Sequence, residues 1–375
     1  MSRRRVCFVL PSLNGGGAER AAVQLLNGLD DGKWDRSMFL FERTGPYLND
    51  LDGGINLQSA PLPSRVARWR AFRKFVGQAQ PHVVMAFLSF ASALTAARAS
   101  GAGAKVVFNQ QTPVSAFLTD SDYAWRHGWR RAAFTAGSRV VYGAADLIVA
   151  TSRGVADDLT RNFGVSPDAM RVVPNPVDLA FVRAKAAEPV AAGEQLPPGD
   201  PVIIAAGRLA DAKNYPLLID AVAKLRESMP ARLCILGQGD LEPALRRRVS
   251  DRGLDTAVTF LGFQTNPWKF IAQADVFALS SHYEGFGNVL VEAMALGVPV
   301  VATASAGTRD IVESERNGVL VHSHTVDAFA AALHRVLTRP ALREAMSRGA
   351  LQAAERYAAP HVIAEYDALL QELAA

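Results

Sequence analysis

The sequence predicts an α/β protein made of two doubly wound domains, each built on a parallel sheet. Two series of short apolar runs alternate with helical segments, one before residue 183 and one after residue 201. Apolar runs separated by helices are typical of buried parallel strands. Residues 184–200 are rich in proline and glycine and are predicted to form a linker. We therefore expect an N-terminal domain over residues 1–183 and a C-terminal domain over residues 201–359.

The first series opens with a strand over Val6–Leu10, a glycine loop and a helix from about Ala18 to Leu29. Glycines let backbone approach a ligand closely, and a helix N-terminus favours an anion. The loop lacks the dinucleotide-binding fingerprint, since Glu19 and Arg20 stand where its last glycine would fall. Further buried strands are expected at Val83–Phe87, Lys105–Phe108 and Leu147–Ala150.

The second series repeats this alternation. Strands are expected at Pro201–Ala206, Arg232–Leu236, Val258–Leu261 and Val276–Ser280. Helices are expected at Pro216–Arg226 and Glu242–Arg252, and a further helix begins near Asn288. Doubly wound sheets bind ligands at the carboxyl ends of their strands. With two such domains, we expect the site in the cleft between them.

The composition is typical of a globular protein long enough for two domains, with 49% hydrophobic and 20% charged residues among 375. Cys7 and Cys234 lie in apolar runs of different domains, so we expect free buried thiols in a reducing compartment. No signal core or membrane span is predicted, and we expect a cytoplasmic protein, with contact to the inner face of a membrane left open. Residues 1–180 hold 21 Lys and Arg against 14 Asp and Glu, a charge of +7 that favours an anionic partner.

Glu292 is the only ionisable residue between positions 285 and 308. A carboxylate in such apolar surroundings requires a partner. Glu284 stands eight residues earlier, just before the helix that begins near Asn288. The helix N-terminus between the two carboxylates suits a phosphate, and each carboxylate can accept hydrogen bonds from hydroxyls. The pattern therefore indicates a site for a sugar nucleotide.

Gly207, Arg208 and Lys213 lie in the loop that follows the first strand of the second domain. A fixed guanidinium and a mobile ammonium can share the charge of a leaving diphosphate. Taken alone, the loop is better explained as a solvated basic segment. Gly237 and Gly239, after the next strand, are typical of a structural strand-to-helix turn.

Glu284 and Glu292 have seven residues between them and are followed by AMALGVPVVAT and Gly307. This arrangement resembles the retaining glycosyltransferases of family 4, and the spacing from Gly207 to Lys213 matches them as well. The resemblance implies a GT-B fold, in which two doubly wound domains face each other across a cleft. It also implies that residues 360–375 form a helix that crosses back to the first domain.

The resemblance further implies which residues act. Glu284 would hold sugar hydroxyls, while Arg208 and Lys213 would stabilise the leaving diphosphate, and these three are the expected catalytic residues. Glu292 would accept from the ribose hydroxyls. The expected donor-binding residues are Gly16, Gly17, Gly207, Phe263, Phe286, Gly287, Asn288, Val289 and Glu292.

We expect no cofactor and no metal, the nucleotide sugar being a substrate. Asp120, Ser121 and Asp122 could be read as the metal-binding D-x-D of the other glycosyltransferase fold, but Asp and Ser are ordinary helix caps there. The seven histidines show no zinc-binding spacing. Many members of the family have a histidine after the strand near residue 108, where this chain has residues Asn109 to Gln111. A glutamine amide can hydrogen-bond there but cannot carry a proton, and what replaces the histidine is left open.

Two clusters in the first domain combine aromatic with basic side chains, over residues 123–134 and at Trp69, Arg70, Arg73 and Lys74. Such a helix can lie on an anionic membrane surface. A core helix with a solvated basic edge is the alternative. Nucleic acid is disfavoured as a partner, because no recognised binding motif accompanies the charge.

We predict a retaining glycosyltransferase that moves a sugar from a nucleotide sugar to a lipid-linked saccharide in surface-polysaccharide assembly. A UDP-sugar is favoured as donor, with GDP-mannose as the alternative. A nucleotide-sugar epimerase of the same fold would instead turn over without an acceptor. A non-catalytic partner of a glycosyltransferase would typically have lost Glu284, Lys213 or the glycine loop, which are all present.

Overall fold

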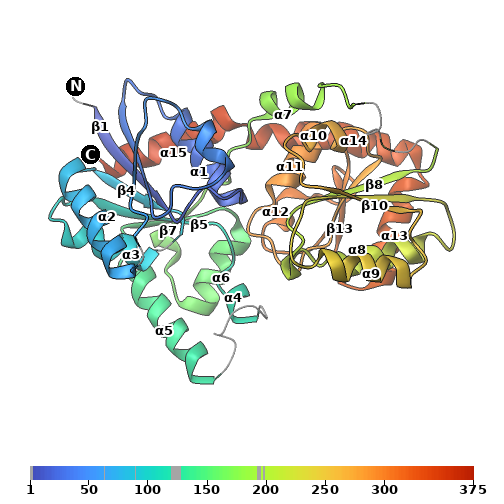
Figure 1. The fold of residues 1–375 in the computed structure, drawn as a ribbon, viewed down its shortest axis with the longest axis horizontal. Coiled ribbons are helices and arrows are strands. Elements are labelled where there is room, and N and C mark those ends of the chain that lie inside the picture. The colour runs from blue at the N-terminus through green and yellow to red at the C-terminus, as the bar shows by residue number, and fades with distance from the viewer. Residues whose placement is uncertain (1–2, 63, 89, 120–127, 192–195, 197–198) are drawn as a thin grey trace. The chain divides into compact units, whose positions relative to one another are not determined.

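The computed structural model describes residues 3–62, 64–88, 90–119, 128–191, 196 and 199–375. The chain forms two compact units, one of residues 1–177 and 359–375 and the other of residues 178–358. Each unit is an open α/β sheet with helices on both faces (Figure 1). No helix among the described residues is long and apolar enough to cross a bilayer.

Unit 1 is built on seven parallel strands in the order β3-β2-β1-β4-β5-β6-β7. The strands are β1 (Arg4–Leu10), β2 (Trp34–Leu40), β3 (Asn56–Ser59), β4 (Val83–Ala86), β5 (Lys105–Gln110), β6 (Leu147–Ala150) and β7 (Met170–Val172). The helices are α1 (Gly17–Gly28), α2 (Arg65–Ala79), α3 (Phe90–Ala99), α4 (Ala116–Thr119), α5 (Gly128–Gly143), α6 (Arg153–Phe163) and α15 (Ala359–Leu373). Short 3₁₀ turns lie at η1 (Pro46–Asp50) and η3 (Pro167–Ala169).

Unit 2 repeats the same winding with six parallel strands in the order β10-β9-β8-β11-β12-β13. The strands are β8 (Val202–Ala206), β9 (Arg232–Leu236), β10 (Val258–Gly262), β11 (Val276–Leu279), β12 (Val300–Thr303) and β13 (Gly318–Val321). The helices are α7 (Leu179–Ala186), α8 (Tyr215–Leu225), α9 (Glu242–Asp251), α10 (Trp268–Ile271), α11 (Asn288–Ala295), α12 (Thr308–Ile311), α13 (Val326–Leu337) and α14 (Pro340–Ala354). Short 3₁₀ turns lie at η4 (Asp211–Lys213) and η5 (Glu355–Tyr357).

Helices cover both faces of each sheet, and the central strands are therefore largely apolar. Val6–Leu10 of β1 and the whole of β4 are fully buried. The predicted fold class, two doubly wound parallel sheets, is confirmed. The N-terminal stretch of unit 1 ends at Val177, before α7, whereas the proline-rich segment predicts a boundary after residue 183. The helix α7 packs on α10 and α11 instead, and the Arg183 guanidinium donates to the carbonyl of Ala295 at 3.1 Å.

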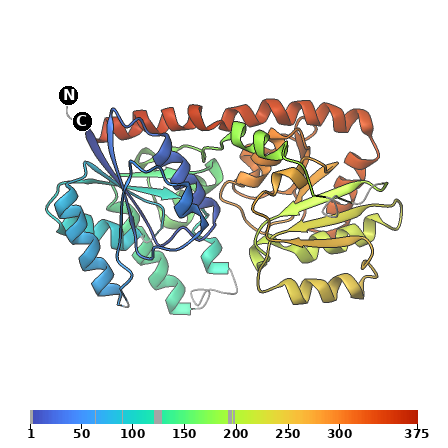
Figure 2. The ribbon, with the colours of Figure 1, turned by 45° about the horizontal axis from the view of Figure 1, so that its top comes forward.

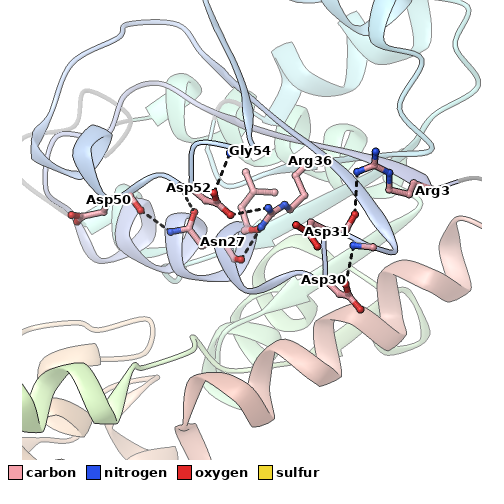
Figure 3. Close-up of polar contacts among 10 residues, drawn as sticks. Arg3, Asn27, Asp30, Asp31, Arg36, Asp50, Asp52 and Gly54 are labelled. Atoms are coloured by element: carbon pink, nitrogen blue, oxygen red, sulfur yellow. Dashed lines mark hydrogen bonds and ion pairs between the residues drawn. The ribbon is translucent and has the colours of Figure 1, made fainter.

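The strand β2 was not predicted because it contains Asp35 and Arg36, yet the Arg36 side chain is almost fully buried. Its guanidinium donates to the carbonyl of Asn27 at 2.8 Å, at the end of α1, and to Asp52 Oδ2 at 2.8 Å (Figure 3). The backbone N–H of Gly54 and then the Arg36 guanidinium hold the pKa of Asp52 below its usual range. These contacts fix the C-terminal end of α1 against the chain that follows β2.

The C-terminal helix α15 belongs to unit 1 and packs on α1 (Figures 1 and 2). A Cβ atom at Gly28 of α1 would lie only 2.3 Å from Ile363 Cδ1, so the two helices approach closely there. The indole N–H of Trp34 donates to Asp367 at 2.6 Å, and Tyr366 is fully buried. The last helix of the chain thus completes the core of the first unit.

Candidate functional site

The predicted residues of unit 2 gather at the point where the winding of its sheet reverses. Strands β8 and β11 are neighbours there, although β9 and β10 separate them in sequence. Ligands of doubly wound sheets bind beside the carboxyl ends of such a pair. The loop after β8 carries Arg208 and Lys213, and the loop after β11 carries Glu284.

The Lys213 ammonium and the Glu284 carboxylate form an ion pair, with Nζ 2.5 Å from Oε1. The Ser281 hydroxyl donates to the same oxygen at 2.6 Å. The side chains of Lys213 and Glu284 are only 24% and 12% exposed, so solvent screens the pair less than it would a surface pair. The structure therefore brings together two of the three residues predicted to be catalytic.

Hydrogen bonds join the loop after β8 to the loop after β11. The N–H of His282 donates to the carbonyl of Ala212 at 2.8 Å. The Ser280 hydroxyl lies 2.9 Å from the carbonyls of both Lys213 and Asn214. Asn214 adopts a left-handed conformation, with φ of 47°, between the 3₁₀ turn and α8. The position of the ammonium is thus set by the loop that presents the carboxylate.

Gly207 leaves room for the stem of Lys213. A Cβ atom at Gly207 would lie 3.3 Å from Lys213 Cε and 3.5 Å from the Tyr215 hydroxyl. That hydroxyl donates to the carbonyl of Gly207 at 3.1 Å. Burial and then the nearby charge of Glu284 raise the pKa of Tyr215 well above its usual value, so the phenol remains a neutral donor.

A third loop, after β9, packs against the loop that follows β8. The N–H of Leu209 donates to the carbonyl of Gln238 at 3.0 Å, and the N–H of Gly207 to that of Leu236 at 2.9 Å. A Cβ atom at Gly237 would lie 2.0 Å from the carbonyl oxygen of Gly207, and Gly237 has φ of 128°. Only glycine fits such a close backbone approach. Gly237 and Gly239 therefore support the loop that carries Arg208.

The remaining loop residues differ in exposure. Arg208 is exposed at the end of β8, and the Phe263 ring, just after β10, is 59% exposed. The Phe286 side chain is buried and packs edge-on against Tyr357, with ring centroids 5.2 Å apart. Of Phe286, only the backbone is therefore suited to contact a ligand.

The helix α11 begins at Asn288, directly after Gly287, which adopts φ of 102° and offers no side-chain cap. Asn288 and Val289 are partly exposed in its first turn. Gly307 closes over the preceding loop: its N–H donates to the carbonyl of Glu284 at 2.9 Å, and a Cβ atom there would lie 2.4 Å from the carbonyl oxygen of Phe286. A helix N-terminus held this way favours an anion.

Glu292 lies one turn into α11 and is 6% exposed. The indole N–H of Trp268, from α10, donates to its Oε2 at 2.7 Å. The Trp268 indole is thus one partner of this carboxylate in its apolar helix. Trp268 was not predicted, because its position beside Glu292 depends on how α10 packs on α11.

The predicted donor-binding residues Gly16 and Gly17 lie in unit 1, at the carboxyl end of β1. Gly17 opens α1, and Gly16 precedes it without a side-chain cap. A Cβ atom at Gly16 would lie 2.2 Å from Oε2 of Glu19, so the Glu19 carboxylate folds back over the start of the helix. A larger residue at position 16 would displace this carboxylate.

The residues that stand where many family members have a histidine form an amide network in unit 1. Gln111 and Asn175 exchange hydrogen bonds through their amides, at 2.9 and 2.8 Å, and Gln111 also donates to Asn109 Oδ1. Asn109 in turn donates to the Tyr366 hydroxyl at 2.8 Å. This network ties the end of β5 to the C-terminal helix.

Two features singled out in the sequence lie wholly or partly outside the described residues. They are the D-x-D segment at residues 120–122 and residues 123–127 of the aromatic and basic cluster. The rest of that cluster lies on α5, where Trp129 is 77% exposed and the Arg130 guanidinium lies 5.7 Å from the centre of its ring. Arg73 lies over Trp69 on α2 at the same distance. Among the described residues, no group of three or more His, Cys, Asp or Glu side chains is arranged to hold a metal ion.

Comparison with known proteins places the chain in a family. The family model described as Glycosyltransferase Family 4 matches residues 15–181, and the model described as Glycosyl transferases group 1 matches residues 188–353. LpsE of Rhizobium meliloti, a lipopolysaccharide core biosynthesis glycosyltransferase, is 27% identical over 88% of this chain and 87% of its own.

A second relative is the N-acetylgalactosamine-N,N'-diacetylbacillosaminyl-diphospho-undecaprenol 4-alpha-N-acetylgalactosaminyltransferase of Campylobacter jejuni. It is 34% identical over 219 residues, which are 58% of each protein. The chain spans 52% to 58% of the length of four curated relatives to which it is 34% to 36% identical.

Solved structures share the fold. Anabaena HepE in complex with UDP and glucose has a TM-score of 0.78 at 20% identity and is matched over 99% of this chain and 100% of its own. Sucrose-phosphate synthase from Thermosynechococcus elongatus has a TM-score of 0.81 at 19% identity, over 99% of each chain. By fold and by both family models, the chain belongs to the group 1 glycosyltransferases of family 4, which have the GT-B fold.

Proposed function

We propose that this protein is a retaining glycosyltransferase that transfers a sugar from a nucleotide sugar to a lipid-linked saccharide. The observation that carries the proposal is the ion pair of Lys213 and Glu284 at the switch point of unit 2. A carboxylate that hydroxyls can approach beside an ammonium, next to the N-terminus of α11, matches the chemistry of a sugar joined to a diphosphate.

Donor binding would use the loops that follow β8, β10 and β11 of unit 2, together with α11. Arg208 and Lys213 would neutralise the diphosphate together with the N–H groups at the start of α11. Glu292, oriented by Trp268, would accept from the ribose hydroxyls. The exposed Phe263 ring would contact the base. In unit 1, we propose the glycine loop with Gly16 and Gly17 as a donor-binding segment that acts through its backbone.

In the proposed transfer, the bond between the anomeric carbon and the diphosphate oxygen breaks as the acceptor oxygen bonds to the same face of that carbon. The acceptor hydroxyl gives its proton to the departing diphosphate oxygen. Lys213 and Arg208 stabilise the negative charge as it develops on the diphosphate. Glu284 holds the sugar hydroxyls, and the anomeric configuration is retained.

The acceptor proposal rests on charge and on relatives. Residues 1–180 carry a net charge of +7, which suits an anionic diphosphate lipid at a membrane surface. The Campylobacter jejuni relative is named for a diphospho-undecaprenol acceptor, and LpsE for lipopolysaccharide core synthesis. A UDP-sugar is our preferred donor, in line with the UDP complex of Anabaena HepE, and GDP-mannose is the alternative.

The test is a transfer assay with UDP-sugars and GDP-mannose and short lipid-linked saccharides, read by proton NMR of the product. We expect transfer that requires an acceptor, an anomeric coupling constant that matches the donor's, and unchanged rates in excess EDTA. An inverted product would contradict the mechanism. Conversion of the donor sugar without acceptor would show an epimerase instead, and absence of any turnover would favour a non-catalytic partner.

A further inference from the structure

Unit 1 contains a cavity of about 560 Å³ at the carboxyl edge of its sheet. Phe87, just after β4, and Gln110, at the end of β5, form its floor, and the helix α5 forms a wall. Most of its lining is apolar, and its volume is in the range of small-molecule sites. It lies at the sheet edge where a doubly wound domain meets its ligands.

The shape of the cavity comes from small residues on α5. Ala133, Gly137 and Val141 line it at a spacing of four residues, which places them on one face of the helix. Of the sixteen residues of α5, Tyr142 alone is buried. The helix packs on the core of unit 1 through Tyr142, Phe134 and Val141, while Ala133 and Gly137 stay exposed and line the cavity.

Three of the five polar side chains that line the cavity are paired within the protein, namely Gln110, Gln111 and Tyr142; the other two are Thr112 and Ser138. The Tyr142 hydroxyl donates to Gln110 Oε1 at 2.6 Å, and the Gln110 amide donates to the carbonyl of Thr112 at 2.5 Å. The amide of Gln111 is bound to Asn109 and Asn175. Because most of the lining is apolar and these three side chains are paired, the cavity favours a largely apolar occupant.

The charge around the cavity indicates what the rest of that occupant carries. The helix α5 contains Arg130, Arg131 and Arg139 and no acidic residue. All three arginines are exposed, as are Trp129 and Val140, at 77% and 73%. A cavity that selects an apolar group beside a basic helix fits an amphiphile with an anionic head group.

We propose that this cavity holds the segment of the polyprenyl chain that adjoins the diphosphate of the lipid-linked acceptor. The proposal rests on the proposed function, since it assigns the lipid part of the acceptor to unit 1. The diphosphate then lies outside the cavity beside the arginines of α5. Each methylene buried there adds about a factor of four to the affinity, so a short chain is enough to measure.

Gly137→Leu fills the cavity with little risk to the fold. A Cβ atom at Gly137 meets no atom within 4 Å, and leucine suits a helix better than glycine. Gly143→Leu is the matched control, because Gly143 lies on the same helix, has equally open surroundings and does not line the cavity. The probes are farnesyl diphosphate and inorganic pyrophosphate, titrated by calorimetry, with UDP as a probe of unit 2.

We expect farnesyl diphosphate to bind the unmodified protein at least tenfold more tightly than pyrophosphate. Gly137→Leu is expected to remove most of that difference, and Gly143→Leu to preserve it. The proposal is overturned if the two probes bind equally, if Gly137→Leu leaves farnesyl diphosphate binding unchanged, or if Gly137→Leu instead dissociates a dimer, which would assign the cavity to a second copy. UDP binding should be the same in all three proteins. If none of them bound UDP, the proposed function would be in doubt, while the comparison of farnesyl diphosphate with pyrophosphate would still test the cavity.

Discussion

Nζ of Lys213 lies 2.5 Å from Oε1 of Glu284, although the two residues are 71 positions apart. They meet because each follows one of the two strands, β8 and β11, between which the winding of the sheet reverses. The ion pair therefore follows from the topology of unit 2. A nucleotide sugar that binds there would bring its diphosphate to the ammonium and its hydroxyls to the carboxylate.

Replacing Lys213 by Met should lower kcat by about 100-fold to 1,000-fold, because the developing charge on the diphosphate loses its cation. The melting temperature of Lys213→Met should stay close to that of the unmodified protein. Lys224→Met is the matched control, since the Lys224 ammonium forms only surface pairs with Glu227 and Asp327. A kcat for Lys213→Met within threefold of the unmodified enzyme would remove Lys213 from the mechanism.

Replacing Glu292 by Gln should weaken UDP binding by about 10-fold to 100-fold, as expected for the loss of hydrogen bonds to a charged group. The same variant should bind UDP and 2′,3′-dideoxy-UDP with similar affinity, whereas the unmodified protein should prefer UDP. Trp268→Phe should give a smaller loss of the same kind, because it removes the N–H that orients the carboxylate. Calorimetry measures the affinities for UDP and 2′,3′-dideoxy-UDP, and the exposed Glu227→Gln serves as control. If Glu292→Gln still preferred UDP, the proposed contact between Glu292 and the ribose would be ruled out.

Replacing Gly237 by Ala should destabilise unit 2 by at least about 2 kcal/mol, since strain at positive φ adds to a clash with the backbone of Gly207. UDP binding should weaken as well, because the displaced loop carries Arg208. Gly253→Ala has positive φ but open space around its Cβ, and should lose only about 1 kcal/mol. Urea denaturation followed by fluorescence compares the two variants, and equal stabilities would show that the close approach has no energetic role.

Replacing Asp220 by Asn should lower the free energy of unfolding at pH 7 by about 1.5 to 3 kcal/mol. Burial raises the pKa of Asp220, but hydrogen bonds from Arg248 and Arg252, at 2.8 and 3.0 Å, outweigh it and lower the pKa below the usual value of 3.8. Because the pKa is lower in the folded state, the stabilisation is complete above pH 3.8 and is lost as the pH falls through the folded value.

Asp220→Asn should therefore flatten the acid side of the stability profile, measured by denaturation between pH 2 and pH 7. The exposed Asp240→Asn serves as control and should keep the original slope. An Asp220→Asn profile parallel to that of the unmodified protein would show that Arg248 and Arg252 do not stabilise the fold through this carboxylate.

Most strands of the two sheets could be predicted, because the central strands are buried on both faces and contain continuous apolar runs. The strand β2 could not, since the burial of Arg36 depends on the end of α1 and on Asp52. The edge strand β3 is short, three of its four residues are polar, and it resembles a loop in sequence.

The loops of the candidate site could be located from glycines and charged residues that follow apolar runs. Their partners could not: Ser281 reaches Glu284, and Trp268 reaches Glu292, only because separate elements pack together. The cavity beside α5 was also not predicted, because alanine and glycine at a spacing of four residues are equally common in packed helices.

The most direct test of the donor site in unit 2 is a thermal unfolding series with UDP, GDP and ADP for the unmodified protein, Lys213→Met and Glu292→Ala. A nucleotide at 100 times its Kd should stabilise the unmodified protein by about 2.7 kcal/mol. We predict that one nucleotide, preferably UDP, stabilises the unmodified protein. The same nucleotide should stabilise Lys213→Met and Glu292→Ala less. No stabilisation by any nucleotide, or a shift that both variants retain in full, would contradict the assignment of this site.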